Sequence, residues 1–148
     1  MKYKIGLVIV LIFAVMQFFV AEKVPYKEPN DQDFLAIEQP SEEVTLLVKT
    51  ICYDCHSNQI TYPWYSEIAP ISWWLNDHIE EGREHLNFSE WGIYSSEKKE
   101  HKAEECWEEV EEEEMPLTSY TVVHRDADLS EEQRALLIAY FKDIEEKY

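Results

Sequence analysis

The sequence predicts a mainly α-helical protein, with one small domain of about four helices preceded by an N-terminal membrane helix. Three observations support this prediction. An apolar run at residues 5–21 is long enough to cross a hydrocarbon core. Several later segments repeat apolar residues at helical spacing and begin with helix-capping residues. Without the apolar run, the chain of 148 residues has room for a single domain.

The apolar run contains one Gln and is preceded by Lys2 and Lys4. Basic residues ahead of such a run place the N-terminus in the cytoplasm and the rest of the chain on the periplasmic side. A cleaved signal peptide is the alternative, but the residues before Ala21 are bulky where a cleavage site needs small ones. We favour an uncleaved anchor, and both interpretations export the domain.

Residues 22–40 differ in composition from the segments on either side. Prolines stand at positions 25, 29 and 40, among Asn, Asp, Gln and Glu. Such a polar, proline-containing stretch is typical of a linker. The sequence therefore predicts three parts: an anchor or signal segment at 1–21, a flexible linker at 22–40 and a helical domain at 41–148.

The first two helices of the domain are predicted from their starting residues and apolar spacing. Ser41 is a good N-cap, and Val44, Leu47 and Ile51 follow at helical spacing. Pro70 is well placed to open the second helix. The predicted buried face of the second helix consists of Ile71, Trp74, Leu75, His78, Ile79 and Gly82.

The third helix is predicted to start at Ser95 or Ser96 and to run towards Glu114. Its inner face consists of Ala103, Cys106, Trp107 and Val110. Its last turn is strongly acidic, which opposes the helix macrodipole, so this end should fray unless a tertiary contact holds it.

The fourth helix is predicted from a capping box formed by Ser130 and Gln133. Its apolar face, predicted to pack on the first helix, consists of Leu136, Leu137, Tyr140, Phe141 and Ile144.

The first helix leads into Cys52-Tyr53-Asp54-Cys55-His56, the C-x-x-C-H pattern of covalent c-type haem attachment. The Cys52 and Cys55 thiols would add across the two haem vinyl groups. His56 would then lie under the iron as its proximal ligand. The pattern therefore predicts one haem c per chain, with the helices wrapped around it.

Two other chemistries use a pair of cysteines at this spacing. A thioredoxin-like redox pair follows a strand in a βαβ pattern, and the sequence has no such pattern. A structural zinc site needs a second pair of Cys or His ligands, which is missing. Haem attachment is therefore the favoured interpretation.

Met115 is the candidate for the distal iron ligand. Met1 is the initiator and Met16 lies in the apolar run, so Met115 is the one methionine available to an exported domain. A thioether opposite an imidazole raises the reduction potential and suits electron transfer. A flexible core residue is the plainer interpretation of Met115. His78, His124 or an open sixth position are the other possibilities.

Several further residues have an expected place around the cofactor. The rings of Tyr62, Trp64 and Tyr65 are expected to wall the haem, because the macrocycle needs an apolar cover. Arg83 is a candidate partner for a haem propionate, although a surface ion pair suits it equally. Cys106 has no evident disulfide partner and is expected to be a small buried residue.

The charge of the exported part is strongly negative. It carries 11 basic residues against 31 acidic ones, a net charge of −20. Such a surface repels nucleic acid and favours a redox partner with a basic surface. A merely solvated acidic exterior accounts for the composition equally well.

Several motifs in order give the chain a family resemblance. They are CYDCHSN at 52–58, YPWYS at 62–66, the run at 69–74, HIEEGREHLNFSEW at 78–91 and MPLTSYTVVH from 115, followed by ADLS. The sequence resembles the small exported bacterial proteins that carry the haem-binding domain, which are similar in plan to mono-haem c-type cytochromes. The resemblance implies covalent haem at Cys52 and Cys55 with His56 as axial ligand, and it is consistent with Met115. It implies a cofactor and no particular reaction.

The expected function is therefore single-electron transfer outside the cytoplasmic membrane. The alternative is a haem-based sensor or binding module with an open sixth position. The protein is not expected to be an enzyme. A peroxidase would need a distal acid or base, and the imidazoles that could supply it are His78, His85, His101 and His124.

Overall fold

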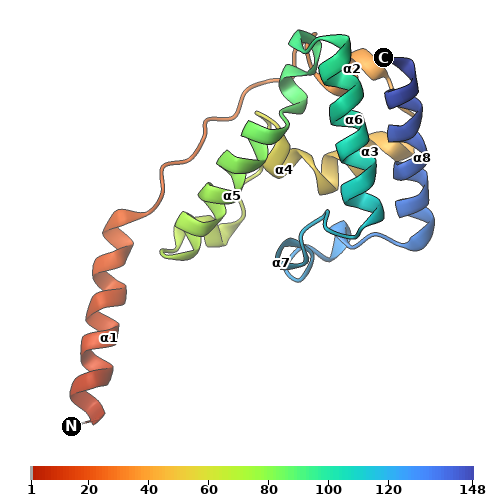
Figure 1. Cartoon of the computed structure of the whole chain (residues 1–148). Helices are drawn as coiled ribbons and strands as arrows, with labels where there is room; N and C mark the ends of the chain where they lie inside the picture. The colour runs from red at the N-terminus through yellow and green to blue at the C-terminus, as the bar shows by residue number, and fades with distance from the viewer. Residues whose placement is uncertain (1) are drawn as a thin grey trace.

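The computed structural model describes residues 2–148, which form helices and connecting turns with no strand among them (Figure 1). The mainly α-helical prediction is therefore confirmed. Four helices of ten residues or more build the domain, and these are α3 (Glu42–Ile51), α5 (Ile71–His85), α6 (Ser96–Glu111) and α8 (Glu131–Lys147). The shorter helices are α2 (Phe34–Glu38), α4 (Tyr53–His56) and α7 (Thr118–Thr121), with 3-10 turns η1 (Gln17–Phe19), η2 (Trp64–Glu67), η3 (Phe88–Ile93) and η4 (Arg125–Ala127).

The predicted caps begin three of the long helices. The Ser41 hydroxyl accepts a hydrogen bond from the Val44 amide at the start of α3. Ser95 caps α6 in the same way, and the capping box of Ser130 with Gln133 is complete at α8. These side chains satisfy amides that have no partner within the helix. The starts of the long helices are thus determined locally.

The C-terminal end of α6 is held by a contact from another helix. The Arg134 guanidinium of α8 donates a hydrogen bond to the carbonyl of Val110. A cation at this point adds to the backbone hydrogen bonds that the Val110 carbonyl already accepts and offsets the acidic last turn. Helix α8 packs mainly along α6 and makes a smaller contact with α3, the partner predicted for it.

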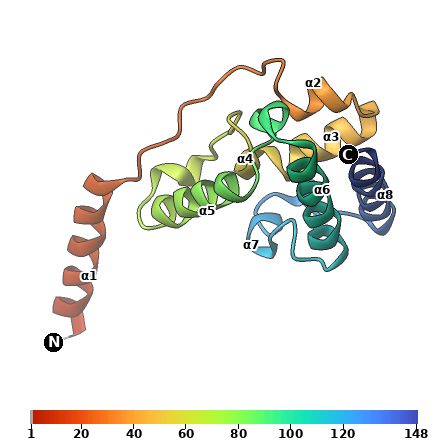
Figure 2. The ribbon, with the colours of Figure 1, turned by 45° about the horizontal axis from the view of Figure 1, so that its top comes forward.

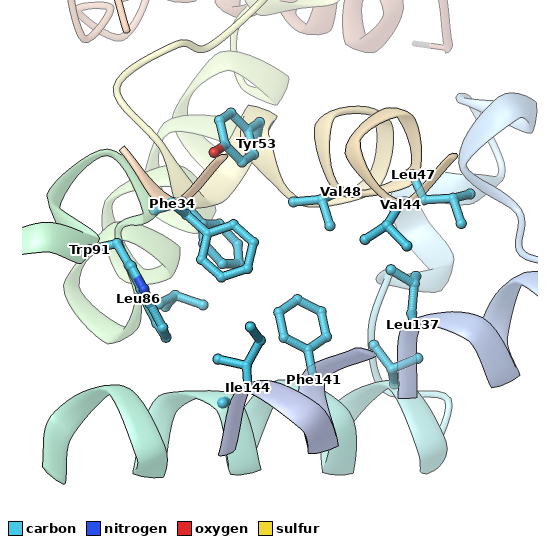
Figure 3. Close-up of a cluster of buried hydrophobic side chains, with 13 residues drawn as sticks. Phe34, Val44, Leu47, Val48, Tyr53, Leu86, Trp91, Leu137, Phe141 and Ile144 are labelled. Atoms are coloured by element: carbon cyan, nitrogen blue, oxygen red, sulfur yellow. The ribbon is translucent and has the colours of Figure 1, made fainter. Parts of the chain in front are cut away.

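The main core includes a residue from the predicted linker. Phe34 of α2 is fully buried, and its ring centroid lies 4.8 Å from that of Phe88 and 5.0 Å from that of Trp91. Figure 3 shows Phe34 pointing into the centre of the cluster, facing Phe141 of α8. The stretch at 33–38 is therefore part of the domain rather than of a flexible linker. A five-residue helix has too few apolar positions to show a period in the sequence.

The buried face of α5 differs from the predicted one. Leu75 and Ile79 are buried as expected, but Ile71 and Trp74 are each more than 40% exposed. Ser72 is buried instead, and its hydroxyl accepts a hydrogen bond from the Ala21 amide at 3.4 Å. The buried face of α5 is therefore shifted from the predicted one towards Ser72.

Helix α1 (Lys2–Met16) extends away from the domain, and its side chains are exposed almost throughout (Figure 2). Together with η1 it gives an apolar helical stretch at Lys2–Phe19 that is long enough to cross a membrane, a length and composition shared with signal sequences. Residues 20–30 then run without helix to the domain.

Candidate functional site

Cys52, Cys55 and His56 lie on one helical turn. Cys52 ends α3, its amide donating to the Val48 carbonyl at 3.0 Å. The amides of Cys55 and His56 donate back to the Cys52 carbonyl at 3.2 and 2.8 Å. Residues three and four positions apart share a helix face, so the three side chains point to one side. All three are half-buried and therefore keep an accessible part.

The two residues between the cysteines hold this turn in place. Tyr53 is buried, stacks on Phe88 with the ring centroids 5.5 Å apart, and donates its hydroxyl proton to Asp33 at 2.8 Å. Asp54 accepts hydrogen bonds from the Thr61 amide at 3.0 Å and the Tyr120 hydroxyl at 2.9 Å. The motif is thus attached to the core on one side and to α7 on the other.

The contacts of His56 suit it to bind iron. Its Nδ1 lies 2.8 Å from the Gly82 carbonyl oxygen and 3.2 Å from that of Leu86. Carbonyl oxygens only accept hydrogen bonds, so Nδ1 carries the proton and the lone pair is on Nε2. Burial lowers the pKa of His56 and keeps the ring neutral. A fixed tautomer of this kind is the usual support of a metal-binding imidazole.

Gly82 allows α5 to pass close to the motif. A Cβ at this position would lie 3.1 Å from the Cys55 carbonyl oxygen and 3.4 Å from Cε1 of His56. Any side chain would therefore crowd the backbone of α4. The sequence placed Gly82 on the inner face of α5, and the structure confirms this.

The surroundings of the two thiols disfavour their ionised form. Burial raises the pKa of Cys52 to about 12 and that of Cys55 to about 11, with a further contribution to Cys55 from the nearby Asp54 carboxylate. Thioredoxin-like pairs instead have a lowered thiol pKa. Within residues 2–148 no three His, Cys, Asp or Glu side chains are grouped as metal ligands. Neither observation favours the redox-pair or the zinc interpretation.

Met115 lies on the loop between α6 and α7, separate in the sequence from the other candidate ligands. It is half-buried, and its amide donates to the Glu109 carbonyl at 3.0 Å. Tyr120, five residues further on, forms the hydrogen bond to Asp54 described above. The structure therefore ties the segment that carries Met115 to the C-x-x-C-H turn.

The alternative histidine ligands have other partners. His124 Nε2 lies 2.7 Å from the Tyr65 hydroxyl, and the His124 ring stacks on Tyr120 with the centroids 4.2 Å apart. His78 Nδ1 lies 2.9 Å from the Trp74 carbonyl oxygen. Sequence reasoning missed the pairing of Tyr65 with His124 and the role of Tyr120, because no local pattern links residues so far apart.

Three more of the predicted side chains have distinct places. Tyr65 packs beside Cys55 in a small cluster with Ile60, Leu75 and Ile79, whereas Trp64 is 75% exposed. Tyr62 also borders that cluster, and its hydroxyl accepts from the Val24 amide at 2.9 Å. The predicted aromatic wall is thus divided between an inner and an exposed part.

Arg83 and Cys106 have separate surroundings. Arg83 donates to the Asn58 side-chain oxygen at 2.5 Å, and its Nε is buried without a hydrogen-bond partner among residues 2–148. Cys106 packs against the main core. It is half-buried rather than fully buried as predicted, and burial raises the pKa of its thiol well above the ordinary value.

One comparison with known proteins gives a match. The family described as the haem-binding domain matches residues 11–143, which is most of the chain. Neither the curated proteins nor the solved structures contain a match.

Proposed function

The chain belongs to the haem-binding domain family, and from this premise we propose that it carries one covalent c-type haem and transfers single electrons. Cys52 and Cys55 form the thioether bonds, and His56 is the proximal ligand. The observation that supports this proposal is the single turn that presents both thiols and a neutral imidazole with its Nε2 lone pair free.

The protein's own residues would hold and orient the cofactor. A bound haem supplies an iron that accepts or gives up one electron. The Gly82 and Leu86 carbonyls fix the His56 ring, and their hydrogen bonds increase its basicity as a ligand. The small cluster around Cys55 and the main core around Cys52 offer apolar surface on either side of the motif.

Met115 is the proposed distal ligand. The hydrogen bond between Tyr120 and Asp54, which joins the chain just after Met115 to the motif, supports this proposal. His124 is the weaker candidate because its Nε2 pairs with Tyr65. The unpaired Nε of Arg83 is a donor that could serve a haem propionate.

The site of action is proposed to be the periplasmic side of the cytoplasmic membrane. Helix α1 would remain as the anchor, with Lys2 and Lys4 on the cytoplasmic side. The exported part carries a large negative charge, which would steer a redox partner with a basic surface towards it.

The intact mass of the denatured protein tests the central proposal. The full chain is expressed with the haem ligation machinery and its mass is measured in acid, where haem that is not covalently bound is lost. We expect the polypeptide mass plus one haem. The Cys52→Ser/Cys55→Ser variant should lose that increment, and the matched variant Cys106→Ser should keep it. A bare polypeptide mass, beside a control cytochrome that matures, would contradict the proposal.

A further inference from the structure

The end of α1 is attached to the domain at the start of α5. The Gln17 side chain forms two hydrogen bonds with Ala69, donating to its carbonyl at 2.9 Å and accepting from its amide at 3.1 Å. The Trp73 indole N–H donates to the Phe19 carbonyl. Both views show the start of α5 beside the end of α1 (Figures 1 and 2). The orientation of the domain relative to α1 is therefore set by direct contacts.

Trp73 lies alongside the last turns of α1. With α1 and η1 it lines an apolar groove of about 300 Å³, whose other walls are Leu11, Ile12, Val15, Met16 and Phe19. Helical residues rise about 1.5 Å each, so the groove covers roughly the last 12 Å of the apolar stretch. A membrane that α1 crosses would therefore have Trp73 at the level of its outer leaflet.

Further exposed apolar side chains lie at the start of α5 and on η2, which packs against α5. We call four of them the aromatic platform: Trp64, Ile71, Trp73 and Trp74, which are between 40% and 75% exposed. Charged residues make up 30% of the chain, yet residues 60–76 contain a single one, Glu67. Glu67 forms an ion pair with Lys23. This stretch is thus mainly apolar, and the exposed acidic side chains of α5 begin after it, at Asp77.

We propose that the aromatic platform lies in the headgroup region of the same bilayer that α1 crosses. Tryptophan is enriched at membrane interfaces, where its ring is partly buried and its N–H finds a polar partner. Continuity with α1 favours lipid over a protein as the occupant, because Trp73 and the last turns of α1 line one apolar groove. The domain is then held at a fixed height above the membrane. This inference rests on the proposed retention of α1.

Tryptophan fluorescence of the full chain in lipid nanodiscs tests the inference. The chain has five tryptophans, all of them in the domain and none in α1. Haem also quenches indole emission, but it does so equally in both bilayers. The readout is therefore a ratio: the emission in brominated phosphatidylcholine divided by the emission in unbrominated phosphatidylcholine. Bromine on the acyl chains quenches only indoles at the membrane. Three of the five tryptophans belong to the aromatic platform. We therefore expect emission to fall in the brominated bilayer, by up to about three fifths if the five indoles emit equally.

The variants identify which tryptophans are quenched. Trp64→Phe/Trp73→Phe/Trp74→Phe should bring the emission ratio back to one, and Trp64→Phe alone should raise it in part without loss of any hydrogen bond. The matched variant Trp107→Phe, which removes an indole bonded to Glu145 of α8, should leave quenching in place.

Two results would overturn the inference: equal emission of the wild type in both bilayers, or quenching that persists in the triple variant. Loss of α1 or of the haem would be visible separately as a change in intact mass.

Discussion

Replacement of Asp33 by Ala should destabilise the domain by about 2–4 kcal/mol, although Asp33 lies in the predicted linker. Asp33 is 2% exposed and accepts hydrogen bonds from the Leu35 amide, the Tyr53 hydroxyl and the Gln59 side chain. Loss of the N-cap of α2 costs about 1 kcal/mol. The Tyr53 hydroxyl, left buried without a partner, costs a further 1–3 kcal/mol or so.

The assay is urea unfolding of the haem-bearing full chain in detergent micelles, followed by far-ultraviolet circular dichroism. Asp33→Asn is the matched control. It keeps an oxygen for Leu35 and Tyr53 and changes the contacts of the other oxygen, with Gln59 and Ser89, so we expect a loss of about 1 kcal/mol. In a Tyr53→Phe background, Asp33→Ala should cost less, because no hydroxyl is then stranded.

Two outcomes would refute this reasoning. Unfolding of Asp33→Ala within about 0.5 kcal/mol of the wild type would show that residues 33–38 are a tether after all. If Asp33→Ala cost the same free energy in the wild type and in the Tyr53→Phe background, the buried hydrogen bond to the motif would contribute nothing to stability.

Three further predictions concern the ligand, the end of α6 and the free thiol. Met115→Ala should change the visible spectra and let the reduced protein bind carbon monoxide rapidly, whereas His124→Ala should leave the spectra unchanged; the reverse pattern would assign the ligand to His124. Arg134→Met should lower the free energy of unfolding by about 2 kcal/mol, since it removes a charged donor from the Val110 carbonyl. As the control, replacement of the exposed Arg125 by Met should change the free energy of unfolding by less than about 0.5 kcal/mol. Equal losses of stability in the two variants would exclude a specific cap on α6 by Arg134. Burial raises the pKa of Cys106, so iodoacetamide should label it slowly from about pH 7 to about pH 9, where an ordinary thiol becomes ionised. Labelling should be fast only in denaturant, as followed by mass spectrometry, and fast labelling of the native protein would place Cys106 at the surface.

The sequence by itself determined the features that depend on neighbours three or four residues apart. Ser41, Ser95 and Ser130 begin their helices because each hydroxyl reaches an amide within its own first turn. The C-x-x-C-H spacing brings both thiols and the imidazole to one face for the same reason. Length and apolar composition likewise predicted the helix at the N-terminus. These signals are local in the chain, so one sequence is enough to recognise them.

Only the tertiary structure decided which surfaces meet. Tyr120 reaches Asp54 from 66 residues away, and His124 reaches Tyr65 from 59. The buried position of Phe34 comes from packing against helices distant in sequence, because a five-residue helix has little periodicity of its own. The inner face of α5 includes Ser72 in place of Ile71 and Trp74, and apolar spacing cannot predict a buried serine. Contacts of this kind join segments far apart in the chain. The spacing of apolar and polar residues within one segment therefore does not predict them.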